Sequence, residues 1–389
     1  MSAAAPALRS LGRARLHVVG VAVAFTAALL LLGLVMVTSA SVTLAARDGD
    51  AFFFLERQLA FAAVGALSAA VALRIPTATW ERLSFALLVI AMLLLVLVMV
   101  PGVGHSVNGS RRWLHLAGVN FQASEAARVL LLVYLCSYVT RREEEVRSSV
   151  LGCLKPLAVL GVASLLLLVE PDLGSGVVLL ATSIGVLFLA GMRLWHFLGL
   201  CALGCIGVAA LTLSSAYRVR RLTAFLDPWA DPFNTGFQLT QSLIAIGRGE
   251  WFGVGLGASV QKLFYLPEAH TDFVFAVLAE ELGFVGIAAV VLLILALVYR
   301  AFTIARMAAA AGLKFQSYLA AAFGIWLGLQ AFINMGVNMG LLPTKGLTLP
   351  LLSYGRSSLL VTLGWIGILL RIYHETQSQR AVALRSVPR

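Results

Sequence analysis

The chain has 389 residues, of which 60% are hydrophobic and only 12% are charged. Its mean hydropathy of +0.93 excludes a soluble domain and predicts a protein with several membrane-spanning segments. The net charge of +11 is concentrated beside apolar segments, which indicates orientation in a membrane and contact with anionic lipid rather than nucleic acid.

Ten apolar windows are candidates for membrane spans. The first, Val18 to Ala40, is longer than the core of a secretory signal, so we expect it to be retained. We therefore predict an all-α polytopic membrane protein with a tail at 1–17, a membrane domain at 18–371 and a second tail at 372–389. The predicted spans are 18–40, 57–73, 83–100, 123–139, 156–169, 173–191, 197–213, 273–298, 317–337 and 357–371.

An even number of spans places both termini on one side of the membrane. The segments on that side contain 17 lysines and arginines against 5 aspartates and glutamates, whereas the rest of the chain contains 12 against 13. Positive loops face the cytoplasm, so both termini are predicted to be cytoplasmic. The final stretch, from Thr376 to Arg389, has the composition of a disordered tail.

Intramembrane charge first appears at Glu125 and Arg128, which are three residues apart on the fourth predicted span. They share a helix face and neutralise one another, either as a structural ion pair or as part of a site that faces a cavity. The next polar stretch, Glu170-Pro-Asp172, has the residues of a tight external turn because proline ends the preceding helix.

A long hydrophilic interval, Ser214 to Thr271, separates the seventh and eighth spans and is predicted to be external. Its basic cluster, Arg218-Val-Arg220-Arg221, is either an anchor to lipid phosphates or a docking strip for a phosphorylated lipid. Farther along, Gln238 to Ile246 has helical spacing and is predicted to lie at the membrane interface as an amphipathic helix.

The interval ends in Leu266-Pro-Glu-Ala-His-Thr-Asp272, immediately before an apolar helix. Thr271 or Asp272 is a candidate N-cap for that helix, which is the ordinary interpretation. However, Glu268, His270 and Asp272 lie together at a membrane margin, where an ionised group is costly to bury unless it has a partner or a function. We therefore regard this stretch as a candidate functional site.

Two cations, Lys345 and Arg356, flank a stretch rich in glycine and proline. Irregular backbone at membrane depth requires surrounding protein or a water-filled cavity, so this stretch is predicted to be re-entrant and to line a site. Metal-ligand spacing is absent from the cysteines, which we expect to be inert packing thiols: Cys136, Cys153, Cys201 and Cys205.

The sequence motifs of this chain, taken together, resemble those of the SEDS family (shape, elongation, division and sporulation) of membrane glycosyltransferases. Within that family, Pro343-Thr-Lys-Gly346 resembles the cell-division members. The resemblance covers nearly the whole chain and rests on Arg57-Gln58, Asn108-Gly-Ser-Arg-Arg-Trp113, Phe121-Gln-Ala-Ser-Glu125, Pro171-Asp-Leu-Gly174, Pro267-Glu-Ala-His-Thr-Asp272, Leu342-Pro-Thr-Lys-Gly-Leu-Thr-Leu-Pro350 and Ser353-Tyr-Gly355.

Three residues depart from the family pattern. Ala123 replaces a proline and Arg128 replaces a lysine, and the second change keeps the charge while exchanging a point ammonium for a planar fork. Arg356 replaces a glycine. A bulky cation there is expected to alter the cavity or to impose a different backbone angle.

The resemblance implies septal peptidoglycan synthesis: polymerisation of lipid II, a disaccharide-pentapeptide on undecaprenyl pyrophosphate, into glycan strands by an inverting transfer. No nucleotide cofactor is expected, because the pyrophosphate link is already activated and Gly253, Gly255 and Gly257 follow no strand and precede no Gly-Lys-Ser/Thr. Pyrophosphate leaves readily once its charge is neutralised, so the chemistry needs cations and a single carboxylate base.

We hypothesise that Asp272 is the base that accepts the proton of the attacking sugar 4-hydroxyl, which is also its role by resemblance. An alternative is that Asp272 binds a divalent cation, Mg or Mn, which shares the charge of the leaving group. Arg128, oriented by Glu125, is one predicted substrate contact. The full set of predicted substrate-binding residues is Glu125, Arg128, Arg111, Lys345, His270 and Ser353.

Two alternative functions are compatible with charged residues inside a membrane protein: a transporter and a scaffold. A flippase for the lipid-linked precursor requires polar lining on both faces of the membrane, whereas the polar motifs here are mainly external. A scaffold that holds division proteins together is the third interpretation.

By resemblance, the expected partner is a class B penicillin-binding transpeptidase of the FtsI type, with further division proteins of the FtsQ, FtsL and FtsB type. The expected location is the bacterial cytoplasmic (inner) membrane at the division septum.

Overall fold

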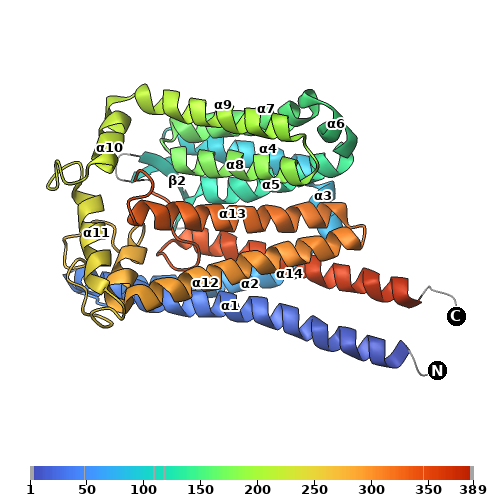
Figure 1. Cartoon of the computed structure of the whole chain (residues 1–389), viewed down its shortest axis with the longest axis horizontal. Helices are drawn as coiled ribbons and strands as arrows, with labels where there is room; N and C mark the ends of the chain where they lie inside the picture. The colour runs from blue at the N-terminus through green and yellow to red at the C-terminus, as the bar shows by residue number, and fades with distance from the viewer. Residues whose placement is uncertain (1–3, 48, 108–109, 117–118, 345, 386–389) are drawn as a thin grey trace.

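A computed structural model describes residues 4–47, 49–107, 110–116, 119–344 and 346–385. Its long helices run side by side in one bundle (Figure 1). Within those ranges, eight helices are long and apolar enough to cross a membrane, and two shorter apolar helices, α4 and α8, accompany them. Each of the ten predicted spans thus falls on a helix, and eight of these helices are long enough to cross a membrane. The ten helices are α1 (Ala4–Arg47), α2 (Phe53–Arg74), α4 (Ser84–Met99), α5 (Ala123–Arg141), α7 (Val150–Val169), α8 (Leu173–Leu189), α9 (Leu194–Leu213), α12 (Val274–Ala310), α13 (Lys314–Asn338) and α14 (Arg356–Arg385).

Shorter elements connect these spans. The connecting helices are α3 (Thr77–Arg82), α6 (Glu143–Ser148), α10 (Ala216–Leu226) and α11 (Phe237–Gly249). A small antiparallel sheet, which the sequence did not predict, has the order β1-β2-β3, with Trp113 opposite Gln122 in its second ladder. Its strands are β1 (Gly104–Val107), β2 (Ser110–Leu116) and β3 (Val119–Gln122).

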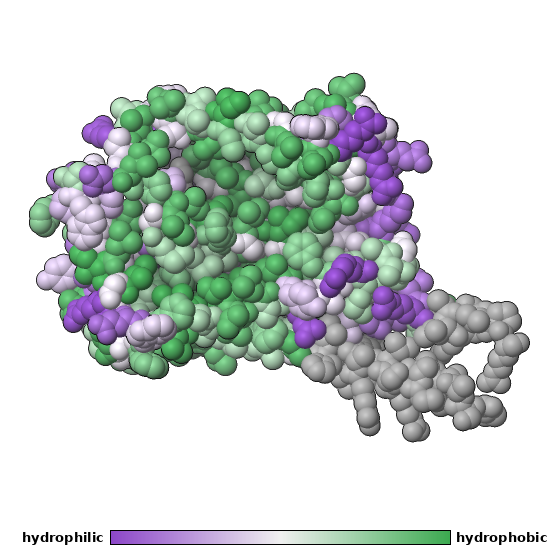
Figure 2. Space-filling view, in the orientation of Figure 1, coloured by the Kyte–Doolittle hydropathy of each residue, from purple (hydrophilic) through white to green (hydrophobic). Residues whose placement is uncertain are grey.

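The two ends of the bundle differ in what they carry. Figure 1 shows α10, α11 and β2 at one end, which we call the loop end, and the start of α1 and the end of α14 at the other, which we call the terminal end. The first and last helices thus have their outer ends at the same end of the bundle, and the side of the membrane on which the termini lie stays a prediction. Hydrophilic residues gather at these two ends and hydrophobic residues cover the surface between them (Figure 2), as expected for a protein that spans a bilayer.

The prediction of a disordered tail from Thr376 to Arg389 was wrong for most of that segment, because α14 continues to Arg385. The first turns beyond the apolar window are held by polar contacts. Arg371 Nε donates to Glu375 Oε1 at 2.7 Å, and the same oxygen accepts from the Thr77 amide of α3 at 3.0 Å. The prediction stopped early because a hydropathy window detects only the apolar part of a helix and not its polar continuation.

Helix α12 is broken at Gly283, whose φ of 63° and ψ of −161° are not helical. The segment after α11 inserts its backbone beside the break. Val254 N donates to Glu280 O at 2.9 Å and Phe284 N donates to Glu250 O at 2.9 Å. The loop thus satisfies backbone groups on both halves of the helix that the break leaves without helical partners.

Helix α11 was predicted to lie at the membrane interface, but its apolar face packs against protein. Leu239 is 3% exposed and Ala245 is fully buried. The Ser242 hydroxyl also donates to the backbone oxygen of Asn338 at 2.8 Å. α11 is therefore part of the core of the loop end rather than a lipid anchor.

The stretch predicted to be re-entrant, residues 346–355 before α14, has an irregular backbone and buried leucines. Leu349 is 1% exposed and Leu352 is fully buried. Helix α1 approaches this stretch so closely that a Cβ on Gly33 would lie 2.4 Å from the backbone oxygen of Leu351. Protein therefore surrounds this irregular backbone, as burial at membrane depth requires.

Candidate active site

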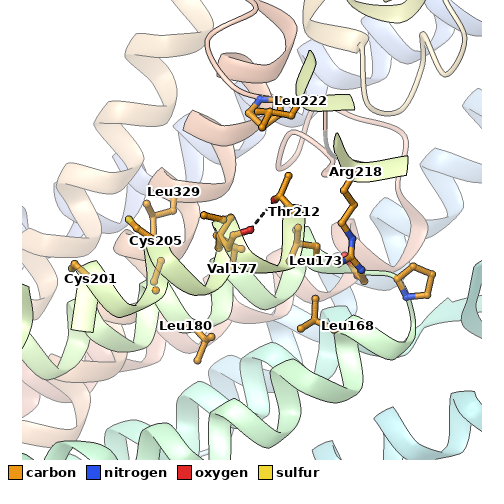
Figure 3. A pocket seen from close by; sticks show the side chains of 18 of the residues that line it. Leu168, Leu173, Val177, Leu180, Cys201, Cys205, Thr212, Arg218, Leu222 and Leu329 are labelled. Carbon is orange, nitrogen blue, oxygen red and sulfur yellow. Dashed lines mark hydrogen bonds between the residues drawn. The ribbon is translucent and has the colours of Figure 1, made fainter. Parts of the chain in front are cut away.

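A cavity of about 1140 Å³ lies between α8, α9 and α13 and reaches the loop end. We call it the groove. Figure 3 shows its wall, with Leu173, Val177 and Leu180 on α8 and Cys201 and Cys205 on α9. No residue of α9 is fully buried, so this helix is loosely attached to the bundle and the groove has one thin, apolar wall. Such a wall suits an elongated hydrocarbon ligand.

Three arginines line the loop end of the groove: Arg112, Arg218 and Arg221. Each donates to backbone carbonyl oxygens. Arg112 Nε bonds to Glu170 O at 3.0 Å, Arg218 Nη1 bonds to Leu211 O at 2.8 Å and Arg221 Nη1 bonds to Thr344 O at 3.4 Å. Carbonyl partners orient the guanidinium groups of Arg112 and Arg218 without neutralising them, so the groove combines an apolar body with cations at its mouth.

Arg218 and Arg221 belong to the basic cluster that the sequence offered as either an anchor or a docking strip. The structure places both side chains at the groove, where Arg218 projects from α10 toward α8 (Figure 3). Arg220 is exposed and does not line the groove. The cluster therefore has one side that faces the groove and one that faces outward.

Asp272 sits at the rim of this mouth, immediately before α12. Its side chain is half-buried, and its Oδ2 would lie 3.1 Å from a Cβ placed on Gly346, a residue that lines the groove. The Asp272 carbonyl accepts hydrogen bonds from the side-chain amides of Asn334 and Asn338, each at 3.0 Å. Two residues of α13 therefore fix the backbone that carries the carboxylate.

Burial raises the pKa of Asp272 to about 7, and the negative charge of Glu268 adds to the shift. Arg112 and Arg221 act in the opposite direction because their positive charges favour the carboxylate form. A carboxyl group with this pKa exists in both protonation states near neutral pH, which is the property required of a general base.

Asp172 also lines the groove, although the sequence indicated only a tight turn there. It is 4% exposed. One carboxylate oxygen caps α8 by accepting from Ser175 N at 3.1 Å, and the other accepts from the Ser124 hydroxyl at 3.2 Å. In the sequence, Asp172 directly precedes the helix that starts at Leu173, and this position could have identified it as the N-cap of α8. Its position at the groove depends on tertiary packing.

His270 and Ser353 were predicted to bind substrate, but neither lines the groove. The His270 ring contacts Phe54 and Tyr354, with centroids 4.6 and 5.6 Å away. Burial lowers its pKa, so the neutral form is favoured. The Ser353 hydroxyl accepts from Leu349 N at 2.8 Å, within the re-entrant stretch. His270 thus packs against aromatic rings and Ser353 supports the backbone of the re-entrant stretch, and a role of either residue in substrate binding stays a prediction.

The predicted ion pair between Glu125 and Arg128 is confirmed. Arg128 is 1% exposed and donates through Nη1 to Gln330 Oε1 at 3.1 Å. Gln330 Nε2 in turn donates to the Thr348 carbonyl at 3.1 Å. The pair does not line the groove; it joins α5 to α13 and, through Gln330, to the re-entrant stretch.

The other predicted contacts lie outside the described structure or need correction. Lys345 and the side chain of Arg111 fall outside the described residues. Arg356, which replaces the family glycine, begins α14 in helical conformation, so no unusual backbone angle is imposed there. Cys136 and Cys153 are buried packing thiols, as predicted, whereas Cys205 is exposed and lines the groove with Cys201.

A divalent cation was one predicted role for Asp272. Among the described residues, no group of three or more His, Cys, Asp or Glu side chains is placed to hold a metal ion. Magnesium, however, is bound in many enzymes by one or two carboxylates together with substrate phosphates. Asp272 and the nearby Asp172, which is close enough to raise its pKa, are compatible with that arrangement.

Comparison with known proteins agrees with this picture. The sequence profile of the FtsW/RodA/SpoVE family, described as "Cell cycle protein", matches residues 21–378. The chain is 59% identical over 350 residues to a probable peptidoglycan glycosyltransferase FtsW of Thioalkalivibrio sulfidiphilus, covering 90% of this chain and 88% of that protein. It is 55% identical over 360 residues to the probable FtsW of Halorhodospira halophila, covering 92% and 91%.

Two solved structures share the fold. A chain of a peptidoglycan synthase complex that coordinates polymerization and crosslinking superposes with a TM-score of 0.72 and 32% identity, covering 91% of this chain and 97% of that one. The rod shape determining protein RodA of Thermus thermophilus superposes with a TM-score of 0.67 and 30% identity, covering 91% and 96%.

Proposed function

The chain belongs to the FtsW/RodA/SpoVE family, and from this premise we propose that it is a peptidoglycan glycosyltransferase that polymerises lipid II into glycan strands. One observation carries the proposal: the apolar groove ends at three arginines, two of which, Arg112 and Arg221, act electrostatically on the Asp272 carboxyl group. A long hydrocarbon tail, a diphosphate and a sugar, which are the successive parts of lipid II, would meet matching chemistry along this path.

The proposed donor site is the groove. The polyprenyl chain lies against the apolar faces of α8 and α9, which are open to lipid along α9. The diphosphate lies at Arg112, Arg218 and Arg221. Guanidinium groups suit this position because they bind phosphate oxygens through paired hydrogen bonds and remain charged in an apolar setting.

In the proposed reaction, Asp272 accepts the proton of the sugar 4-hydroxyl as that oxygen attacks the anomeric carbon. A new glycosidic bond forms on the face opposite the bond that breaks, so the configuration at that carbon inverts. The electron pair of the broken bond leaves with undecaprenyl pyrophosphate, and the arginines of the mouth stabilise its charge. This arrangement requires one carboxylate base and no nucleotide.

As the alternative role for Asp272, we propose that it would bind a divalent cation together with the diphosphate instead of acting as base, and that the cation would supply additional positive charge to the leaving group. The arginines and the cation then serve the same purpose.

The flippase alternative is less favoured by the distribution of charge. The charged residues that line the groove in the described part of the chain all belong to its loop end: Arg112, Asp172, Arg218 and Arg221. A transporter with alternating access needs polar groups along a path to both faces.

The scaffold alternative requires no groove at all. The similarity to a synthase complex supports the proposal that a class B penicillin-binding transpeptidase is a partner, together with other division proteins. The loop end would then face outward from the bacterial inner membrane at the septum.

The test is polymerisation of purified lipid II by the full chain, with and without the transpeptidase. Asp272→Asn is expected to lose roughly two to four orders of magnitude in rate if proton abstraction by Asp272 matters. Near-normal glycan production by this variant would refute the assignment. Activity that is unchanged in excess chelator would exclude the metal contribution.

Groove occupancy has its own readout, because Cys205 is exposed in the groove while Cys136 and Cys153 are buried. In a Cys201→Ala background, a maleimide is expected to label Cys205, and undecaprenyl pyrophosphate is expected to slow that labelling. Equal labelling rates with and without the lipid would argue that the tail binds elsewhere.

A further inference from the structure

Two adjacent carboxylates in the first half of α12, Glu280 and Glu281, are each 0% exposed. Neither lines the groove, so the reaction proposed above does not use them. Buried ionised groups in a membrane protein are costly unless they are paired, and those that persist usually have a specific role. The side-chain and backbone groups that bind them come largely from one short stretch, residues 259–262, which we call the anchor turn.

Glu281 forms a three-way contact. Lys262 Nζ of the anchor turn lies 2.7 Å from Glu281 Oε1 and 2.8 Å from the Ser39 hydroxyl of α1. The Ser39 oxygen lies 2.7 and 2.8 Å from the two carboxylate oxygens, so it donates to Glu281 and accepts from Lys262. Helix α1, helix α12 and the anchor turn are thereby joined through one buried ion pair.

Glu280 binds the same turn from its other side. It accepts from the Ser259 hydroxyl at 2.5 Å, from Val260 N at 3.1 Å and from Gln261 N at 3.4 Å. Arg248 of α11 approaches it at 3.4 Å. A carboxylate that accepts from a hydroxyl and successive amides fixes the backbone of the turn, as a capping carboxylate does at a helix start.

The anchor turn leads directly into residues 263–272, which we call the Asp272 loop. Leu266 N donates back to Gln261 O at 2.9 Å. Two residues of the loop have a positive φ although neither is glycine: Phe264 at 70° and Glu268 at 56°. L-residues are strained in this region, and such a backbone persists only where surrounding structure holds it. Asn334 and Asn338 hold the far end of the loop.

We propose that Lys262, Glu280 and Glu281 are positioning residues that hold the Asp272 loop in the geometry that brings its carboxylate to the groove. They act through the backbone between the anchor turn and Asp272 and touch neither the groove nor the proposed substrate. Ser39 extends the same contact to α1. The inference rests on the proposed role of Asp272 in catalysis, but the placement of the loop is a separate, measurable property.

The first test compares Lys262→Met, Glu281→Gln and the two changes combined. Each single change leaves one buried charge without its partner, whereas the combination removes both charges. We expect each single variant to lose about tenfold or more in kcat with KM within about twofold, and the combined variant to regain most of that loss. Lys314→Met is the control for loss of an exposed ion pair, because Lys314 is an exposed lysine paired with Glu143 at the terminal end.

The second test measures hydrogen exchange of backbone amides and needs no activity. Peptides that cover residues 263–272 are expected to exchange faster in the single variants and to return toward the wild-type rate in the combination, while peptides from α13 stay unchanged. If Asp272→Asn proves active while this pattern holds, the catalytic role proposed for Asp272 fails and the positioning of its loop by these residues stands.

Unchanged kcat and unchanged exchange in the single variants would overturn the inference. So would a combined variant that is as impaired as either single one. Should a single variant fail to fold, Ser259→Ala carries the test, because it removes one donor to Glu280 and strands no charge. Full kcat and unchanged exchange of the Asp272 loop in Ser259→Ala would then refute the proposal.

Discussion

Gly249, the last residue of α11, lies against the backbone of α12, so that a Cβ on the glycine would be 1.9 Å from the carbonyl oxygen of Ala279. That carbonyl immediately precedes Glu280, whose carboxylate binds the anchor turn. The close approach of α11 and α12 therefore lies next to the contacts that place Asp272.

Gly249→Ala is expected to disrupt this contact, because the atom that the new Cβ meets belongs to the backbone and cannot rotate away. We expect a much lower yield of folded protein and a lower unfolding temperature. Gly247→Ala is the matched control, since nothing lies within 4 Å of a Cβ there and alanine is favoured over glycine within a helix by roughly 0.5–1 kcal/mol. Equal stability of the two variants would show that α11 and α12 are not packed as described.

The sequence was sufficient to predict the spans, since hydropathy reports which segments can lie in lipid. The Glu125–Arg128 pair was also predictable, because contacts three residues apart on a helix follow from helical geometry alone. By contrast, Ser39, Lys262 and Glu281 come from distant parts of the chain. Nothing in their local sequence indicates that they meet.

The groove was not predictable for a related reason. Val177 and Cys205 belong to ordinary apolar helices, and an apolar residue that faces a cavity has the same hydropathy as one that faces lipid. The break in α12 was similarly concealed, because glycine is frequent in membrane helices and Gly283 lies inside the window 273–298 that was predicted as one span. Tertiary packing determines both features.

The pKa of Asp272 predicts how activity depends on pH. Because burial raises this pKa to about 7, the carboxylate that acts as base is lost as the pH falls below that value. The polymerisation rate is expected to rise with pH and to level off above about 7, measured as kcat/KM for lipid II over pH 5–9. Glu170→Gln serves as a control: burial raises the pKa of Glu170 to about 8, and removing that ionisation is expected to leave the rise near pH 7 in place.

The same shift predicts that Asp272 costs stability above neutral pH. The pKa is near 3.8 in the unfolded chain and about 7 when folded, so the folded state binds the proton more tightly and stability falls as the pH rises between these values. Asp272→Asn abolishes this ionisation. It is expected to unfold at a higher temperature than the wild type at pH 8, with the difference vanishing at about pH 4. A variant that is less stable at pH 8 would contradict the assigned burial.

Arg128 is expected to matter mainly through its charge. Arg128→Met leaves Glu125 buried without its partner, and breaking a buried ion pair in this way typically costs about 3–5 kcal/mol. Adding Glu125→Gln to that variant should recover most of the loss. Arg128→Lys keeps the charge but not the planar fork that also reaches Gln330, so an intermediate effect is expected. Unfolding in detergent ranks the variants, and equal costs for Met and Lys would count against a charge-based role.

The two sides of α10 provide a matched pair of arginines for the proposed diphosphate site. Arg218 lines the groove, whereas Arg220, two residues later, is exposed. Arg218→Gln is expected to raise KM for lipid II by about tenfold, because one charge-assisted hydrogen bond to phosphate contributes roughly 1.5–3 kcal/mol. Arg220→Gln removes the same charge from the same helix and should change KM by less than about twofold, since an exposed charge is screened by salt. If both variants raised KM equally and the effect disappeared at high salt, the arginines would act as a general surface charge and the diphosphate would have to bind elsewhere.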